Sequence, residues 1–525
     1  MYRCNHNADA TMAKLISADI TDNKLCILEY TTTDGQMLSI KPDVFDAEIV
    51  SHTYTDKGKI IFKKPITTIG RDAFSRCVTL VSITIPDSVT TFGGYTQTLA
   101  SITNSKTTIV NNVFNGCSSL TEFYGKYASE DGRCLIVNGE LQSFAPARLT
   151  GYTIPDSVTK IGTYAFDSCS RLTSVTIPNS VTTIEYCAFF NCSSLTSITI
   201  PDSVTKIGAA AFAYCSRLTN VTIPNSVTKI GNCTFQNCSS ITSIAIPNSV
   251  TTIGFSTFYN CRSLTSITIP DSVTTIGAWA FRNCSSLSIV TIPNSVITIG
   301  TIAFAGCKAL TSVTIPNSVT TIGAGAFRKC SSLKEFKGNF AYNGGSCLII
   351  NGVLNAFAIG CNVIQCMIPD NVTTIGWSAF DDCNSLTSIT IPNSVTTIDN
   401  FAFSSCSCLT SVTIGSGVTS IRASAFAYCS SLTSIIIPNS VTTIDNFAFK
   451  CCISLTSVTI GSRVREIGEE AFKNCNIDTV VCCPQVPPKL NNSFGKFENL
   501  IVPTGCEEAY ANSDWGKYLE QIAIH

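Results

Sequence analysis

Short runs of alternating apolar and polar residues recur along most of the chain. In LTSITIP, residues 195–201, Ile198 and Ile200 are apolar, whereas Ser197 and Thr199 are polar. Because successive side chains of a strand point to opposite faces, this alternation predicts a short strand with buried isoleucines and solvent-facing hydroxyl groups. Pro201 predicts the end of the strand, since proline lacks the N–H that a sheet ladder requires.

A second apolar group follows in the same stretch. Val204 and Ile207 come after an Asp-Ser pair that suits a turn. Ala211, Phe212 and Cys215 are spaced as on a short helical or 3₁₀ turn whose apolar side packs on the strand. One such stretch cannot bury its own apolar face, whereas stacked copies share a continuous core, so the pattern predicts a repeat solenoid.

The stretch recurs with a period of 23 residues, and each copy carries a phenylalanine followed three residues later by a cysteine. The phenylalanines stand at positions 166, 189, 212, 235, 258, 281, 304 and 327, then at 380, 403, 426, 449 and 472, with earlier copies at 74 and 114. The repeat therefore covers most of the chain, and a count of separate globular domains from chain length does not apply.

The consensus IPxSVTxIGxxAFxxCxxLTxIT, found from about residue 60 to about residue 480, resembles the BspA-like (treponemal-type) leucine-rich repeat family. The resemblance implies a leucine-rich repeat solenoid of 23-residue coils, with a parallel β-sheet on one face and short helical or 3₁₀ turns on the other. It also implies a curved array and a role in adhesion at bacterial or protist surfaces. Fold by itself does not establish function, so that role is an expectation by analogy.

Two insertions interrupt the period, and they resemble each other. Residues 118–147 read SSLTEFYGKYASEDGRCLIVNGELQSFAPA, and residues 331–360 read SSLKEFKGNFAYNGGSCLIINGVLNAFAIG. Each contains an Asn-Gly pair between alternating apolar residues, which is a strong hairpin signal. We therefore predict β-hairpins at 133–144 and 346–357 that continue the sheet of the array.

The two ends of the chain lack the repeat. Residues 26–40 suggest a hairpin around Asp34-Gly35, and residues 507–522 suggest an amphipathic helix that covers the last coil. The expected organisation is an N-terminal β-rich cap (1–64), first repeats (65–117), a hairpin insertion (118–154), a first repeat block (155–330), a second hairpin insertion (331–368), a second block (369–475) and a C-terminal cap (476–525).

Composition excludes several classes of protein. The 525 residues carry 34 Lys+Arg and 35 Asp+Glu, so no basic footprint for nucleic acid is present. No apolar run approaches the roughly 18 residues of a membrane span. The histidines, His6, His52 and His525, lie apart from any acid or nucleophile in the pattern, and no phosphate loop or nucleophile elbow occurs. We expect no enzyme, no cofactor and no metal.

The cysteines present three alternatives. The positions in the repeat are Cys169, Cys192, Cys215, Cys238, Cys261, Cys284, Cys307, Cys330, Cys383, Cys406, Cys429, Cys452 and Cys475, preceded by Cys77 and Cys117. Stacked coils would bring them within disulfide range. A metal site would need four converging ligands. A structural ladder of buried thiols is the favoured interpretation, because nearly all of these cysteines precede a core leucine and free cysteine is usually buried.

The outward strand positions form the candidate ligand-contact face. They place hydroxyl and amide groups in columns, at Ser174, Thr176, Ser197, Thr199, Asn220, Thr222, Ser266, Thr268, Ser312, Thr314, Ser388, Thr390, Ser411 and Thr413, with Lys334 and Glu335 as charged exceptions. Ile289 and Ile436 also replace polar residues there. Strand propensity and solubility explain the hydroxyl groups, and a broad multivalent contact surface is the functional alternative. Aromatic residues in the turns, such as Trp279 and Trp377, are expected either to be exposed or to fill gaps between coils.

These observations favour a non-catalytic solenoid that binds a protein or glycoprotein ligand as a surface or secreted adhesin. An intracellular interaction scaffold and a structural lattice protein are the alternatives. Residues 1–20 contain no apolar core of about 7–15 residues such as a signal peptide has, so a cytoplasmic location stays open beside the cell surface that the resemblance favours. The ligand and the oligomeric state are not predicted.

Overall fold

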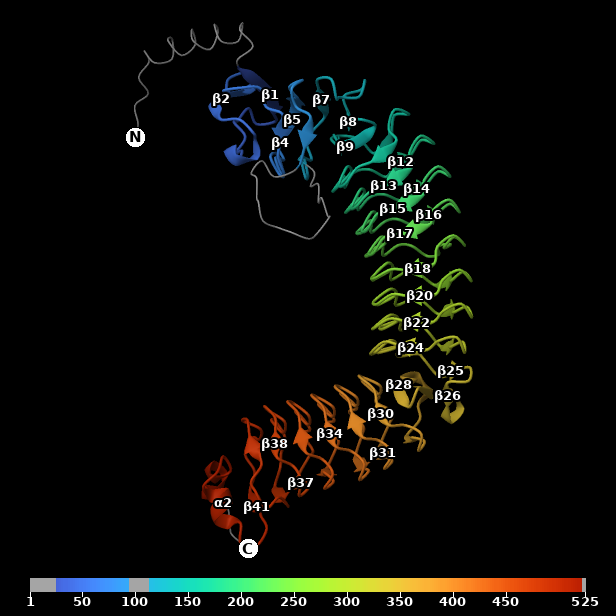
Figure 1. Ribbon diagram of the computed structural model, residues 1–525, viewed down its shortest axis with the longest axis vertical. Helices are drawn as coiled ribbons and strands as arrows, with labels where there is room; N and C mark the ends of the chain where they lie inside the picture. Colours follow the sequence, from blue (N-terminus) through green and yellow to red (C-terminus); the bar gives the residue numbers. More distant parts are fainter. Residues whose placement is uncertain (1–24, 94–112, 522–525) are drawn as a thin grey trace, which may run out of the picture. The chain divides into compact units, whose positions relative to one another are not determined.

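The computed structural model describes residues 25–93 and 113–521, and the chain divides into two compact units, Met1–Val250 and Thr251–His525. In each unit short strands stack in parallel from one coil to the next, as the 23-residue period predicts (Figure 1). The solenoid prediction is therefore confirmed within each unit. The unit boundary falls inside the segment 155–330.

The first unit begins with a sheet in the order β2-β3-β1-β5-β7. Its strands are β1 (Cys26–Thr32), β2 (Ile49–Tyr54), β3 (Gly58–Phe62), β5 (Leu80–Thr84) and β7 (Glu122–Tyr124), with a 3₁₀ turn η1 (Pro42–Val44) and a short pair β4 (Thr68–Ile69) and β6 (Thr91–Phe92). The predicted hairpin around Asp34-Gly35 is wrong. Both edges of β1 are already occupied, by β3 and by β5, so residues 36–40 have no edge to join. Leu38 instead donates its N–H to the Tyr30 hydroxyl at 3.1 Å.

Between residues 151 and 230 each coil of the first unit contributes one strand to each of two sheets. The first sheet contains β10 (Gly151–Thr153), β12 (Ser174–Thr176), β14 (Ser197–Thr199) and β16 (Asn220–Thr222). The second contains β8 (Cys134–Val137), β9 (Glu140–Phe144), β11 (Lys160–Ile161), β13 (Thr183–Ile184), β15 (Lys206–Ile207) and β17 (Lys229–Ile230). Partners stand one period apart, as in the pairing of Val175 with Ile198. Equivalent side chains therefore form columns.

The second unit has the same construction. Its outward strand face is formed by β19 (Ser266–Thr268), β21 (Ile289–Thr291), β23 (Ser312–Thr314), β25 (Glu335–Lys337), β29 (Gln365–Met367), β31 (Ser388–Ile391), β33 (Ser411–Ile414), β35 (Ser434–Ile436), β37 (Ser457–Ile460), β39 (Thr479–Cys482) and β41 (Asn499–Ile501). The second row is β18 (Thr252–Ile253), β20 (Thr275–Ile276), β22 (Thr298–Ile299), β24 (Thr321–Ile322), β26 (Ala341–Tyr342), β27 (Cys347–Ile350), β28 (Val353–Phe357), β30 (Thr374–Ile375), β32 (Thr397–Ile398), β34 (Ser420–Ile421), β36 (Thr443–Ile444), β38 (Glu466–Ile467) and β40 (Lys489–Leu490).

Both predicted hairpins are present and extend the second row of strands. β8 and β9 pair antiparallel around Asn138-Gly139, and β9 then pairs in parallel with β11. β27 and β28 do the same around Asn351-Gly352, and β28 pairs in parallel with β30. Two 3₁₀ turns, η2 (Asn343–Gly345) and η3 (Ile359–Cys361), flank the second hairpin.

The turn segment of a coil differs from a regular 3₁₀ helix. In the coil that starts near Gly162, the N–H groups of Tyr164, Phe166 and Ser168 donate to carbonyl groups of the next coil at 3.1, 2.8 and 2.8 Å. The intervening N–H groups donate three residues back within the coil. Tyr164 and Ser168 have φ values of 57° and 57°, a left-handed conformation that breaks helical continuity. The turn segment is thus a third hydrogen-bonded ladder between coils.

The core of each unit is a stack of phenylalanine rings beneath the strands. Rings of Phe166 and Phe189 stack with centroids 4.8 Å apart, and those of Phe189 and Phe212 with centroids 5.3 Å apart. In the second unit one stack runs from Phe258 to Phe327 with consecutive centroids 5.1–5.4 Å apart, and another from Phe357 to Phe494 with consecutive centroids 4.7–5.2 Å apart. These spacings are close to the roughly 4.8 Å between neighbouring strands, because the backbone ladder sets the separation of the rings.

The C-terminal end departs from the predicted helix over 507–522. It forms a short helix, α2 (Glu507–Ala511), followed by a 3₁₀ segment, η4 (Gly516–Gln521), while Ile522 lies outside the described residues. The break lets two buried rings reach carbonyl groups of the last coil. Tyr510 donates its hydroxyl to Pro484 O at 2.8 Å, and Trp515 donates Nε1–H to Pro488 O at 2.8 Å. A continuous helix would place these two residues on different faces.

Candidate functional site

The candidate contact positions lie on the outward strand faces. In the first unit Ser174 and Thr176 are exposed on either side of buried Val175, and the same pattern repeats at 197–199 and 220–222. In the second unit it repeats at 266–268, 312–314, 388–390 and 411–413, where each outward residue is exposed or half-buried. Lys334 is exposed, and Glu335 is half-buried and pairs with Lys337 at 3.0 Å. The structure therefore brings the predicted positions together within each unit.

Exposed aliphatic side chains interrupt the strand face of the second unit. Ile289 is 64% exposed and Ile436 is 68% exposed, as expected from their outward positions in the strand alternation. Met367, at 82%, and Ile364, at 61%, belong to the same face but were missed by the sequence analysis. Their coil leaves the second insertion and lacks the consensus, and the pairing of Met367 with Thr390 is what identifies its column.

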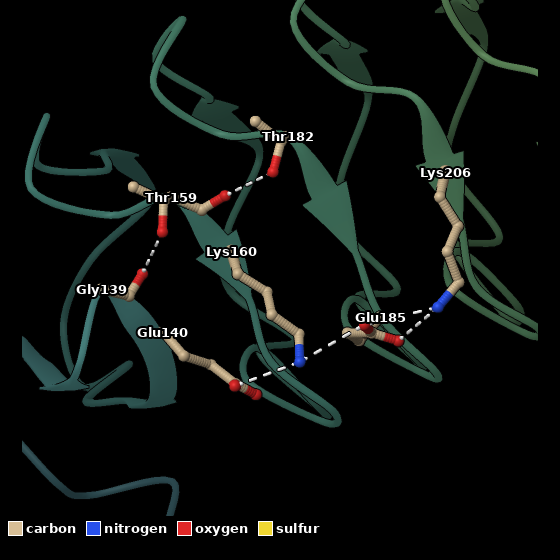
Figure 2. Close-up of polar contacts among 7 residues, drawn as sticks. All are labelled: Gly139, Glu140, Thr159, Lys160, Thr182, Glu185 and Lys206. Atoms are coloured by element: carbon tan, nitrogen blue, oxygen red, sulfur yellow. Dashed lines mark hydrogen bonds and ion pairs between the residues drawn. The ribbon is translucent and has the colours of Figure 1, made fainter.

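Hydroxyl groups beside the strands connect the coils. Thr196 donates Oγ1–H to Thr173 O at 3.0 Å, and Thr219 donates to Thr196 O at 3.0 Å. A similar column runs along the second row, where Thr159 donates to Gly139 O at 3.3 Å and Thr182 to Thr159 O at 3.2 Å (Figure 2). These hydroxyl groups are engaged in the backbone ladder, so the outward strand positions on either side of the buried central residue are the better candidates for ligand contact.

A ladder of opposite charges crosses four coils of the first unit. Lys160 contacts Glu140 at 3.1 Å and Glu185 at 3.4 Å, and Glu185 contacts Lys206 at 3.2 Å (Figure 2). Partial burial lowers the pKa of Lys160, but hydrogen bonding to Glu140 and the two negative charges outweigh this effect and raise the pKa overall. Lys206 stands in register with Lys229. Because the ladder is largely paired internally, it supports coil register rather than a binding site.

The cysteine positions of the repeat are buried from Cys117 onwards, whereas Cys77 is half-buried. Those from 169 to 475 are at most 8% exposed. Cys215 and Cys238, for example, donate S–H to carbonyl groups 26 residues earlier, Phe189 O at 3.2 Å and Phe212 O at 3.0 Å. Burial raises the pKa of the Cys284 and Cys330 thiols to about 12. Such thiols are poor nucleophiles because only the thiolate reacts readily.

Aromatic residues of the turn segments pack on each other and on cations. Arg282 lies over the Trp279 ring, 4.5 Å from its centroid. Phe255 packs against Trp279 with centroids 5.6 Å apart and stays 43% exposed. These residues are therefore partly exposed and also fill gaps between coils.

Other kinds of site find little support in residues 25–93 and 113–521. That part of the chain contains no group of three or more histidine, cysteine or acidic residues arranged to hold a metal ion. Its helices are all too short or too polar to cross a membrane. His52 accepts or donates a 2.7 Å hydrogen bond with the Tyr30 hydroxyl, and burial lowers its pKa. His6 and His525 lie outside the described residues.

Comparisons with known proteins identify the same leucine-rich repeat that the 23-residue period indicates. The family model of the BspA type leucine rich repeat region matches residues 51–129, 140–264, 251–343 and 354–478. A leucine rich cell surface protein from Faecalibacterium prausnitzii is 31% identical, with a TM-score of 0.53, and the match covers 72% of this chain and 93% of that one. A leucine-rich repeat protein from Bacteroides ovatus is 24% identical, with a TM-score of 0.47, and the match covers 83% and 94% of the two chains. A search of curated proteins gave no match.

Proposed function

The chain belongs to the BspA-type leucine-rich repeat family, and we propose that it is a cell-surface adhesion protein whose strand face binds an extended host or matrix glycoprotein. Its repeat class supports a protein-interaction solenoid and is typically non-catalytic. The name of the Faecalibacterium prausnitzii relative supports the surface location.

One observation carries this proposal: the strand face of the second unit combines columns of exposed hydroxyl groups with isolated exposed aliphatic side chains. Met367 and Ile436 stand in the same column, three coils apart. At roughly 4.8 Å per coil they are about 14 Å apart. Apolar anchors on a polar, uncharged field are typical of protein interfaces, in which few residues supply most of the affinity. Repetition then lets several weak contacts act together.

Binding to immobilised matrix glycoproteins and to a glycan array tests the proposal. Each anchor is exchanged for the polar residue of neighbouring coils, as Ile289→Ser, Met367→Thr and Ile436→Thr, so that the fold is retained. We expect the triple variant to bind at least tenfold more weakly. Ile297→Thr is the matched control, because Ile297 is 48% exposed but lies beside the second row of strands.

Unchanged binding by the triple variant would refute the assignment of the strand face. Absence of binding to both panels, or retention of the natural gene product in the cytosol, would refute the adhesin proposal. Retention in the cytosol would favour an intracellular interaction scaffold instead.

A further inference from the structure

The two hairpin insertions offer an internal comparison. In each, the hairpin takes the place of a regular coil, so one turn segment is missing between two that remain. Phe114 and Phe166 flank the first insertion, and Phe327 and Phe380 flank the second. Counted from these phenylalanines, Asn115 corresponds to Arg328, and Asp167 corresponds to Asp381.

At the second insertion, side chains bridge the missing turn. Arg328 donates Nε–H to the Asp381 carboxylate at 2.5 Å and lies over the Trp377 ring, 5.2 Å from its centroid. The next residues form another ion pair, between Lys329 and Asp382, at 3.2 Å. Asp381 is 3% exposed. The second insertion is therefore closed by an aromatic ring and two ion pairs.

At the first insertion the bridging residues are absent. Asn115, Gly116 and Thr163 stand where the second insertion has Arg328, Lys329 and Trp377. A cavity of about 660 Å³ lies between the flanking turns, a volume within the usual range of roughly 300–1,000 Å³ for ligand sites. It is contained in the first unit.

The buried acid is nevertheless retained in this cavity. Asp167 lines it and is only 9% exposed. Among the described residues, no lysine or arginine forms an ion pair with its carboxylate, in contrast to Asp381. Burial raises the pKa of Asp167 to about 7. Asp167 keeps a hydrogen bond with the Ser168 hydroxyl, but a buried carboxyl group without a matched positive charge is costly, and further hydrogen bonds from a ligand would reduce that cost.

Other residues that line the cavity offer positive charge and aromatic surface. Lys41, Arg71 and Arg76 supply positive charge, Arg71 being also paired with Asp72 at 3.2 Å. The side chain of Tyr164 and the half-buried ring of Phe190 supply apolar surface. The cavity thus offers cations, a hydrogen-bonding carboxyl group and aromatic rings to one occupant.

We propose that this cavity binds an acidic sugar residue, with its carboxylate at Lys41 and Arg76, a hydroxyl group at Asp167 and its apolar ring face against the aromatic rings. Arginine binds a planar carboxylate through two parallel hydrogen bonds. A compact dianion such as phosphate would use the cations alone and would be repelled by Asp167, whereas a sugar acid carries one negative charge and several hydroxyl donors. This site is separate from the strand face of the second unit.

Calorimetric titration of the full chain with galacturonate, glucuronate and N-acetylneuraminate tests the proposal, with galactose as the neutral comparator. We expect at least one acid to bind and galactose to bind at least tenfold more weakly. The double variant Asn115→Arg, Thr163→Trp copies the closed arrangement of the second insertion and is expected to weaken binding at least tenfold. Arg76→Gln tests the charge alone and is expected to weaken binding of the acid but not of galactose.

The control for the double variant is the reverse exchange at the second insertion, Arg328→Asn with Trp377→Thr, which should leave sugar binding unchanged.

Polygalacturonate separates two sources of the ligand. Binding of the free acid alone indicates a small molecule, and binding of the polymer indicates a glycan. Binding of none of the acids, equal binding of galactose, or retention of binding by the closed variant overturns the proposal. The triple strand-face variant should bind the sugar normally, so this site and the adhesin proposal fail independently.

Discussion

Exchange of one buried carboxyl group should reveal how the open insertion differs from the closed one. Asp167→Asn removes the ionisable group and keeps the size of the side chain. In the folded protein burial holds the pKa of Asp167 near 7, against an ordinary value of 3.8. We therefore expect the variant to be more stable than the natural protein at pH 8 and no more stable at pH 4.

The sign follows from proton binding in the two states. Well below pH 3.8 the carboxyl group is protonated in both the folded and the unfolded chain, so ionisation contributes nothing to stability. Between pH 4 and pH 7 the unfolded chain loses the proton while the folded chain keeps it, and stability falls as the pH rises. A pKa raised from 3.8 to about 7 corresponds to a loss of at most about 4 kcal/mol above pH 7.

Hydrogen exchange measures the effect locally, which suits a repeat array whose coils contact mainly their neighbours. Protection of the amides in residues 160–175 is compared between the variant and the natural protein at pH 5, 6.5 and 8. Comparison at equal pH cancels the intrinsic rate of exchange. The difference in opening free energy should grow with pH towards about 4 kcal/mol.

The equivalent exchange at the second insertion is the control. Burial raises the pKa of Asp381 too, but the hydrogen bond and the charge of Arg328 oppose that rise. Asp381→Asn should therefore gain less stability with rising pH than Asp167→Asn, and it should lose the hydrogen bond to Arg328, worth about 1.5–3 kcal/mol. Above pH 7 Asp167→Asn should thus stabilise its coils by more than Asp381→Asn does. A difference between Asp167→Asn and the natural protein that does not change with pH would refute the reasoning.

Three further outcomes are expected. Phe212→Ala should lower the free energy of unfolding by about 3–5 kcal/mol, because the ring stacks between two others with centroids 5.3 and 5.7 Å away; a loss below 1 kcal/mol in urea unfolding would contradict the stacked core. The oxidant diamide should form a disulfide between Cys347 and Cys366, whose sulfur atoms are 3.5 Å apart. The protein should then lose the mass of two hydrogens and gain about 3 kcal/mol of stability. Cys366→Ser should prevent the disulfide, and recovery of an unmodified Cys347 peptide after oxidation would disprove the prediction. Glu185→Gln should lower the free energy of unfolding by less than about 1 kcal/mol, and by nothing at 1 M salt, since the ion pairs of Glu185 are half-exposed. A larger or salt-independent loss in thermal unfolding would contradict the view that this charge ladder is a weak surface feature.

The fold was largely predictable because the same local pattern occurs many times. A single LTSITIP stretch could be a strand or an irregular loop, but its recurrence every 23 residues leaves stacking as the only way to bury every Phe and Cys. The hairpins were predictable from Asn138-Gly139 and Asn351-Gly352, since few residues adopt the turn that such pairs form.

Predictions failed where a neighbouring segment competed for the same position. The Asp34-Gly35 signal is as good locally as the other two, yet β3 and β5 already occupy both edges of β1. The C-terminal helix breaks because Tyr510 and Trp515 must both reach carbonyl groups of the final coil. Met367 was missed because its column is visible only from the strand register.

The sequence by itself determined the period, the buried faces of the strands and the positions of the hairpins, because each depends on residues close together along the chain. Only the tertiary structure decided what happens between coils. Asn115 and Arg328 are unremarkable in sequence, but they face Asp167 and Asp381 across a missing turn, and so one insertion is open and the other closed. That outcome depends on residues 52 or 53 positions apart, a distance at which neither hydrophobic period nor turn chemistry carries information.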